Sequence, residues 1–140
     1  MAINTARQDL EIAGIDTSSM SDQQLLDLMW DPATKKYEPT EAVQALRYQN
    51  ETGIEITGRA NGAGDITTSN GNIDLMGAPN NPNYYNADSF KKQIENHATK
   101  PGVDQTAIDM TNVPANQRED VINYINKLND QGENIVVFGI

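Results

Sequence analysis

Apolar residues recur along this chain at two spacings, one typical of helices and the other typical of strands. In five stretches they return every three or four positions, which places them on one face of a helix. These stretches are 5–13, 21–30, 39–51, 87–98 and 115–129. Elsewhere apolar and polar residues alternate, or apolar residues form a short continuous run, as they do in strands. These segments are 54–58, the hairpin-like stretch 64–77, 106–110 and 134–140.

The order of these elements predicts an α/β fold with a mixed, α+β-like sheet. We expect a helix-strand-strand-strand-helix-strand core, followed by one more helix and a C-terminal strand and preceded by a short helical segment. Short turns make the first three strands an antiparallel meander, whereas the helix at 115–129 requires a parallel crossover between the last two strands. The run Ile135-Val136-Val137-Phe138 is typical of a strand buried on both faces.

The length of 140 residues predicts a single domain with a core of its own. Within it we expect a helical linker or entry segment at residues 1–36 and the main domain at 37–140. The start of the chain lacks the basic and apolar regions of a signal peptide, and no apolar run approaches the length of a membrane-spanning helix.

A hairpin turn is predicted at Asn70-Gly71, because this dipeptide between two alternating runs favours a two-residue type I′ turn. With the turn centred there, Asp65 and Asp74 lie on one face as diagonal neighbours, about 7 Å apart at the backbone. Carboxylates at that spacing can share one Mg²⁺ ion, which prefers oxygen ligands; the alternative is a solvated polar face beside a turn. Because we expect that face to point away from the core, replacing Asp74 should cost little stability.

The charge balance restricts the partners that this chain can bind. Twenty acidic residues oppose ten basic ones, for a net charge of −10, and there is no cysteine for disulfides or thiolate zinc sites. Binding of nucleic acid depends on lysine and arginine side chains that neutralise phosphates, so this acidic chain needs a local basic patch or a metal ion. In a nuclease we expect four cationic side chains to converge on the two aspartates: Arg47, Arg59, Lys91 and Lys92.

The alternative to an enzyme is an acidic, non-catalytic binding module, such as an immunity protein or a nucleic-acid mimic. The net charge of −10 favours this interpretation. It predicts an unbroken negative surface around Asp65 and Asp74, where a nuclease should gather positive charge.

Local sequences and the element order together resemble one known family. The segments that carry the resemblance are 41–53, 64–65, 73–77, 89–100, 106–110 and 135–139. They resemble the C-terminal nuclease toxin domains of contact-dependent growth-inhibition systems and other polymorphic bacterial toxins. Such domains belong to the PD-(D/E)xK, or restriction-endonuclease-like, superfamily. The resemblance covers roughly residues 37–140.

The resemblance implies a toxin effector domain that cleaves phosphodiester bonds of RNA, with tRNA favoured, or of DNA, with a divalent metal such as Mg²⁺. It also implies delivery as part of a secreted or cell-surface effector and action in the cytoplasm of a target bacterium. A cognate immunity protein would neutralise it, residues 37–140 would form the nuclease-like domain, and the folded domain would not enter a membrane.

The acidic part of the family's motif carries over to specific positions. Asp65 and Asp74 match its two metal-binding acids, so both are candidate catalytic residues and metal ligands. The preceding helix usually supplies a glutamate that faces the metal. That position aligns with Gln49, our third candidate metal ligand, with Glu41 and Glu51 as alternatives.

The basic part of the motif departs from the pattern. A lysine normally stands two residues after the second acid, but Met76 occupies that position. A lysine of the following helix can replace it, and Lys91 and Lys92 are available there, with Lys92 our candidate catalytic residue. Without such a lysine the domain would be weakly active or inactive.

His97 is the only histidine of the chain. Its spacing from Phe90 and Ile94 places it on the inner stripe of the helix at 87–98. It is either a part-buried structural histidine or a general acid–base in metal-free RNA cleavage, with Lys100 one turn further on. Asp109, at the end of a buried-type strand, is predicted to pin a loop or a helix start.

Overall fold

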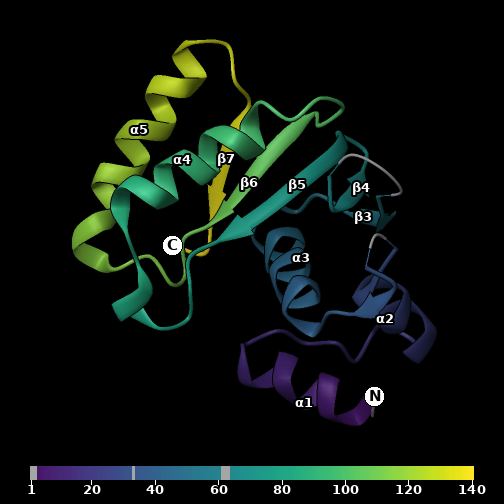
Figure 1. Ribbon diagram of the computed structural model, residues 1–140. Coiled ribbons are helices and arrows are strands. Elements are labelled where there is room, and N and C mark those ends of the chain that lie inside the picture. Colours follow the sequence, from purple (N-terminus) through teal and green to yellow (C-terminus); the bar gives the residue numbers. More distant parts are fainter. Residues whose placement is uncertain (1–2, 33, 61–63) are drawn as a thin grey trace.

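The computed structural model describes residues 3–32, 34–60 and 64–140, and its architecture confirms the expected mixed α/β fold (Figure 1). The α-helices of these residues are α1 (Ile3–Ile12), α2 (Asp22–Met29), α3 (Pro39–Thr52), α4 (Ala87–Ala98) and α5 (Arg118–Asp130), with short 3-10 helices η1 (Pro82–Tyr84) and η2 (Ala115–Gln117). The main sheet contains β3 (Ile56–Arg59), β4 (Ile66–Thr68), β5 (Gly71–Gly77), β6 (Gln105–Asp109) and β7 (Ile135–Phe138), and a small sheet contains β1 (Trp30–Asp31) and β2 (Lys36–Tyr37). None of the described helices is long and apolar enough to cross a membrane.

The strands of the main sheet lie in chain order, from β3 at one edge to β7 at the other. The pairs β3–β4 and β4–β5 are antiparallel, as expected for strands joined by short turns. The pairs β5–β6 and β6–β7 are parallel, and each is connected through a helix. The predicted meander and the predicted parallel crossover are therefore both confirmed.

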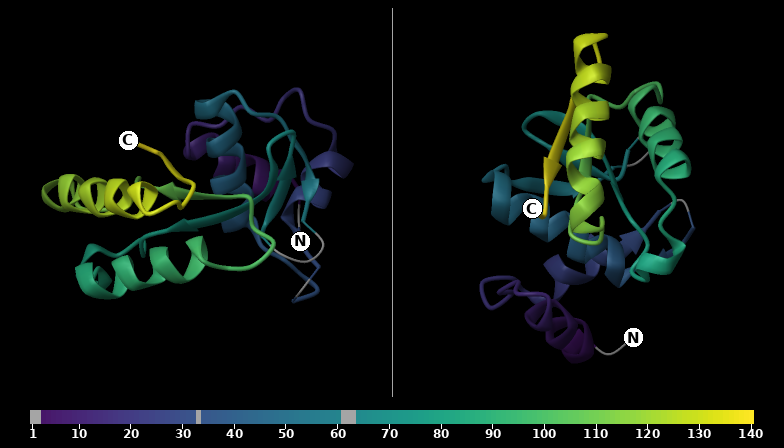
Figure 2. Two further views of the ribbon diagram at one scale, coloured as in Figure 1. Left: turned by 90° about the horizontal axis from the view of Figure 1, so that it is seen from above. Right: turned by 90° about the vertical axis from the view of Figure 1, so that its left-hand side faces the viewer.

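The two faces of the sheet are covered by different helices, because successive strand residues point to opposite faces. One face packs with α1, α2 and α3, which gather at one end of the molecule, and the other packs with α4 and α5 (Figures 1 and 2). The sheet residues of the first face are Ile66, Ile73, Leu75, Ala107 and Phe138. Those of the second face are Met76, Ile108 and Ile135.

The N-terminal segment shares the first of these cores. Leu10 of α1 and Leu25 of α2 are buried in the same cluster as the inner residues of α3. Ser21 caps α2, since its side chain accepts from the backbone N–H of Gln24 while the Gln24 side chain accepts from the N–H of Ser21. The expected boundary after residue 36 falls inside β2, a strand that the apolar pattern did not predict.

The β4–β5 hairpin forms with a register different from the predicted one. Ile66 pairs with Ile73 and Thr68 with Gly71, so the turn residues are Ser69 and Asn70. A type I′ turn centred on Asn70-Gly71 needs a positive φ at both residues, but of the two only Gly71 has one, at 103°. Because the register moved by two residues, an even number, each side chain stays on its predicted face.

Gly71 begins β5 at a position that only glycine fits. A Cβ there would lie 2.2 Å from Oδ2 of Asp104, the oxygen that accepts from the N–H of Asn72. We therefore expect Gly71→Ala to lower the free energy of unfolding by roughly 2–3 kcal/mol, from the left-handed backbone and the displaced Asp104 together.

Gly132→Ala is the matched control for this prediction. Gly132 has the same φ of 103°, but a Cβ at that position meets nothing within 4 Å. Only the backbone cost of about 1 kcal/mol should remain in that variant. Urea unfolding of both variants measures the difference, and equal losses would show that the contact with Asp104 contributes nothing.

Candidate functional site

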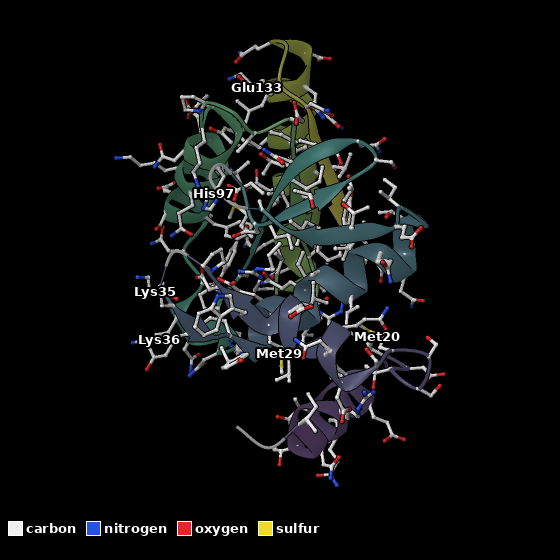
Figure 3. All side chains as sticks on the ribbon, turned by 90° about the vertical axis from the view of Figure 1, so that its right-hand side faces the viewer. Met20, Met29, Lys35, Lys36, His97 and Glu133 are labelled. Carbon is white, nitrogen blue, oxygen red and sulfur yellow. The ribbon has the colours of Figure 1, made fainter. Side chains whose placement is uncertain are left out.

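Four polar side chains meet on the sheet face that α4 covers. Asp65 precedes β4, Asp74 lies in β5, His97 lies near the end of α4, and Lys100 follows that helix. Figure 3 shows His97 on α4, at the side of the molecule. Residues from three separated segments thus form one cluster, which we call the Asp74 cluster.

The prediction that the two aspartates share a face is confirmed, since their side chains are hydrogen-bonded to each other. The regular β4–β5 pairing ends at Ile66 and Ile73. Beyond it the N–H of Asp65 donates to the carbonyl of Ile73 at 2.8 Å, so Asp65 lies at an irregular end of the ladder and not in the predicted regular register. Asp65 also accepts a hydrogen bond of 2.7 Å from the N–H of Leu75, which holds its carboxyl group against β5.

Asp74 is buried at the centre of the cluster, with 2% of its surface exposed. Its Oδ2 contacts Nδ1 of His97 and accepts a hydrogen bond of 3.3 Å from Nζ of Lys100. Burial alone would raise the pKa of Asp74, but hydrogen bonds from His97 and Asp65 and the positive charges of His97 and Lys100 outweigh it and lower the pKa. This carboxylate faces away from the core of Ile73 and Leu75, as expected, but α4 packs over it and buries it. The expected small stability cost of replacing Asp74 therefore does not follow.

The pKa of Asp65 is shifted in the opposite direction, upward. Burial raises its pKa to about 7; the hydrogen bond from Leu75 opposes this shift, while the hydrogen bond to Asp74 and the charges of Asp74 and Glu41 add to it. Two adjacent carboxyl groups therefore take different protonation states below a pH of about 7. Asp74 is ionised, and Asp65 holds a proton that it can release. Such a pair is typical of acid–base sites.

His97 and Lys100 connect the buried carboxylate to solvent. Their side chains are 31% and 46% exposed, whereas that of Asp74 is 3% exposed. Because Asp74 contacts Nδ1, the other ring nitrogen of His97, Nε2, lies on the opposite side of the ring. A carboxylate that fixes one nitrogen sets the orientation and tautomer of a histidine that acts through the other.

The structure does not bring Gln49 to the carboxylates. The Gln49 side chain accepts a hydrogen bond of 2.9 Å from the N–H of Ile56 and so joins α3 to β3. It lies on α3, which packs on the sheet face opposite Asp74. Of the two alternatives, Glu41 lies close enough to raise the pKa of Asp65, whereas Glu51 accepts from the N–H of Gly139.

Three of the four cations predicted to converge on the aspartates pair with other carboxylates, and the fourth is exposed. Lys91 pairs with Asp120 at 2.7 Å, Arg47 pairs with Asp109 at 2.7 Å, and Arg59 pairs with Glu41. Lys92 is exposed on α4. Five residues before His97, it points roughly 140° away around the helix. Lys100 supplies the positive charge instead, so the surface at the cluster is not uniformly negative.

Two further predictions have clear outcomes. Met76 is buried against the α4–α5 core, so the usual lysine position of the motif faces no solvent. Asp109 accepts hydrogen bonds from the N–H and the hydroxyl of Thr111, at 3.0 and 2.6 Å. Its predicted role of pinning a loop is confirmed.

The donor set offers only part of a metal site. Asp65 and Asp74 are adjacent oxygen donors, but Asp74 is already bound to His97 and Lys100. Asp65 has a pKa of about 7 and is therefore protonated at lower pH. Within the described ranges, no three side chains of ligand type are grouped so that they could hold an ion. Binding of Mg²⁺ stays a prediction, in which the ion would compete with the Lys100 ammonium.

Lys100 and the burial of Asp74 contribute more to the cluster than the sequence pattern indicated. The spacing of His97 and Lys100, three residues apart at the end of a helix, was a usable signal, because such residues lie on the same side. An aspartate flanked by apolar residues in a strand was a second signal, since the strand Gly71–Gly77 is nearly continuous in burial.

Comparison with known proteins adds no family to this geometry: no protein-family model, no curated protein and no solved structure matches the chain.

Proposed function

We propose that this chain is a nuclease that cleaves RNA, with His97 as its general base. The observation that carries the proposal is the Asp74 cluster: a buried carboxylate holds a histidine and a lysine, beside a second carboxyl group with a pKa of about 7. Acid, base and positive charge are the three groups that phosphodiester cleavage needs.

The proposed reaction gives each of these groups one role. Nε2 of His97 takes the proton from the 2′-hydroxyl of the substrate, and the 2′-oxygen attacks the adjacent phosphorus. The bond from phosphorus to the 5′-oxygen breaks, and that oxygen takes the proton of Asp65. The products are a 2′,3′-cyclic phosphate and a 5′-hydroxyl. Lys100 offsets the negative charge that develops on the phosphate, and Asp74 is a positioning residue for His97 and Lys100.

The biological setting proposed with this activity is that of a bacterial toxin effector domain. The resemblance of residues 37–140 to polymorphic toxin nucleases supports it. The same resemblance supports tRNA as substrate, delivery into the cytoplasm of a target bacterium and a cognate immunity protein that covers the Asp74 cluster. An acidic toxin should bind an immunity protein that is basic at the contact, because like charges across an interface are costly.

Cleavage of RNA by the purified chain tests the proposal. We expect His97→Gln to lower the rate by about 10²-fold or more, since general acid–base catalysis contributes about that much. Lys100→Gln should lower the rate while the fold is kept, and Lys127→Gln, at an exposed position of α5, should not change it. A folded wild-type chain that leaves tRNA and mixed RNA intact would favour the non-catalytic acidic module.

Chelation separates the two possible mechanisms. If His97 and Asp65 supply the base and the acid, EDTA should leave cleavage unchanged and the product should carry a 2′,3′-cyclic phosphate. Loss of cleavage in EDTA and its return with Mg²⁺ would favour the metal-dependent nuclease that the resemblance implies.

A further inference from the structure

The chain's only tryptophan lies at the surface of the small β1–β2 sheet. Trp30 pairs with Tyr37 across the two strands, and the ring centroids are 5.0 Å apart at an interplanar angle of 65°. The two residues are 37% and 42% exposed. Two large rings therefore remain open to solvent at one place, although an aromatic residue at a helix end more often anchors packing.

Two adjacent lysines accompany these rings. Lys35 and Lys36 are both exposed, and Lys36 lies in β2 next to Tyr37. Lys35 is the only non-glycine residue with a positive φ in the described part of the chain, and its N–H donates to the carbonyl of Asp31 at 2.8 Å. We call Trp30, Lys35, Lys36 and Tyr37 the Trp30 patch. In a chain with a net charge of −10 it combines aromatic surface with two positive charges.

Partly buried charged side chains lie between the Trp30 patch and the Asp74 cluster. Arg59 lies 4.0 Å from the carboxylate of Asp31 in β1 and pairs with Glu41. The charge of Glu41 in turn contributes to the raised pKa of Asp65. Lys35, Lys36 and His97 lie toward the same side of the molecule (Figure 3). One extended ligand can therefore contact the Trp30 patch and the Asp74 cluster from the same side of the molecule.

We propose that the Trp30 patch binds single-stranded nucleic acid. Bases stack on Trp30 and Tyr37, and phosphates contact Lys35 and Lys36. Stacking on aromatic rings tolerates any base, and lysines neutralise the backbone, which together give binding without sequence preference. The binding itself is independent of the proposed function; only the path of the bound strand, which extends from the patch toward the Asp74 cluster, rests on that function.

The binding experiment uses the whole chain with the His97→Gln substitution, in EDTA, and a twelve-nucleotide oligodeoxythymidylate that lacks the 2′-hydroxyl. Because Trp30 is the only tryptophan, its fluorescence reports directly on stacking, and anisotropy of a labelled oligonucleotide gives the affinity. We expect the oligonucleotide to quench Trp30 with the same dissociation constant that anisotropy gives.

Matched variants locate the contact. Trp30→Leu should weaken binding by about 10-fold or more, whereas Trp30→Phe should keep most of it, because a ring still stacks. Tyr84→Leu removes a ring that is 75% exposed elsewhere and should leave binding unchanged. Lys36→Gln should lower the magnitude of the slope of log affinity against log salt concentration by about 0.7. Lys127→Gln removes the same charge from another place and should lower that slope less.

The outcomes separate this inference from the proposed function. Quenching without any RNA cleavage by the wild-type chain supports the inference and contradicts the nuclease. RNA cleavage by the wild-type chain without oligonucleotide binding overturns the inference alone. Binding that leaves Trp30 fluorescence unchanged, or that Trp30→Leu and Lys36→Gln do not weaken, also overturns it.

Discussion

Asp74→Asn should cost this protein both stability and activity, although it changes a single atom of the side chain. The substitution removes a buried negative charge to which His97 and Lys100 are both bound. An asparagine amide also places hydrogen-bond donors where the two partners already donate. We expect the free energy of unfolding to fall by roughly 2–4 kcal/mol, at the lower end of the cost of breaking a buried pair because both partners reach solvent. RNA cleavage should fall by about 10²–10⁴-fold.

Urea unfolding and cleavage assays on the same preparations measure both effects. Asp130→Asn, at an exposed position near the end of α5, is the control for loss of one negative charge. The stability cost should disappear as the pH falls through the lowered pKa of Asp74 in the folded protein, since the carboxylate is then protonated in both states. An Asp74→Asn variant as stable as wild type at neutral pH would contradict the assignment of Asp74 as the ionised centre of the cluster.

Asp65→Asn should stabilise the folded protein at high pH and strongly lower its rate of RNA cleavage. The pKa of Asp65 is raised from 3.8 to about 7 in the folded state, so the folded chain holds a proton that the unfolded chain releases. Stability should therefore fall as the pH rises from about 4 to about 7 and then level off. At about 1.4 kcal/mol per pKa unit the loss is at most roughly 4 kcal/mol, and partial solvent exposure reduces it to roughly 1–3 kcal/mol.

Asparagine imitates the protonated form of Asp65 at every pH. Its amide oxygen can accept from the N–H of Leu75, and its amide nitrogen can donate to Asp74, as the carboxyl group does. The variant should match wild type near pH 4 and exceed it by roughly 1–3 kcal/mol near pH 8. It cannot release a proton to the leaving 5′-oxygen, so cleavage should fall by about 10²-fold or more.

Denaturation curves at both pH values, together with the pH–rate profile, check this prediction. Asp130→Asn again controls for the change in net charge. If the stability difference between Asp65→Asn and wild type is the same at pH 4 and pH 8, then the Asp65 carboxyl group does not titrate near neutral pH. The proposed acid would then have to be another group.

Local sequence determined the secondary structure of this protein well. The helix Ala87–Ala98 has the bounds that its apolar spacing predicts, and α3 begins at Pro39 and ends before Gly53, which adopts the left-handed conformation. Such signals act over a few residues, through caps, proline and glycine. The alternation of β4 and β5 likewise fixed the face of Asp65 and of Asp74.

The hairpin register was decided beyond the turn itself. Asn70-Gly71 predicts a type I′ turn from two residues, but Asp104, more than thirty positions away, accepts from the N–H of Asn72 where β5 begins. The side chain of Thr68 accepts from the N–H of Asn70 at 3.0 Å and favours a different turn. The contact with Asp104 is absent from the short-range pattern, and the contact of Thr68 with Asn70 competes within it.

Only the tertiary structure decided which side chains complete the site. The sequence showed that Asp65 and Asp74 share a face, but α4 buries that face, which the alternation in one hairpin cannot reveal. Lys100 reaches Asp74 from beyond the end of α4, whereas Lys92 lies on another side of that helix, and Gln49 is excluded because α3 packs on the opposite face. Strand and helix periods are local, whereas the packing of one element on another depends on contacts between residues distant in the chain.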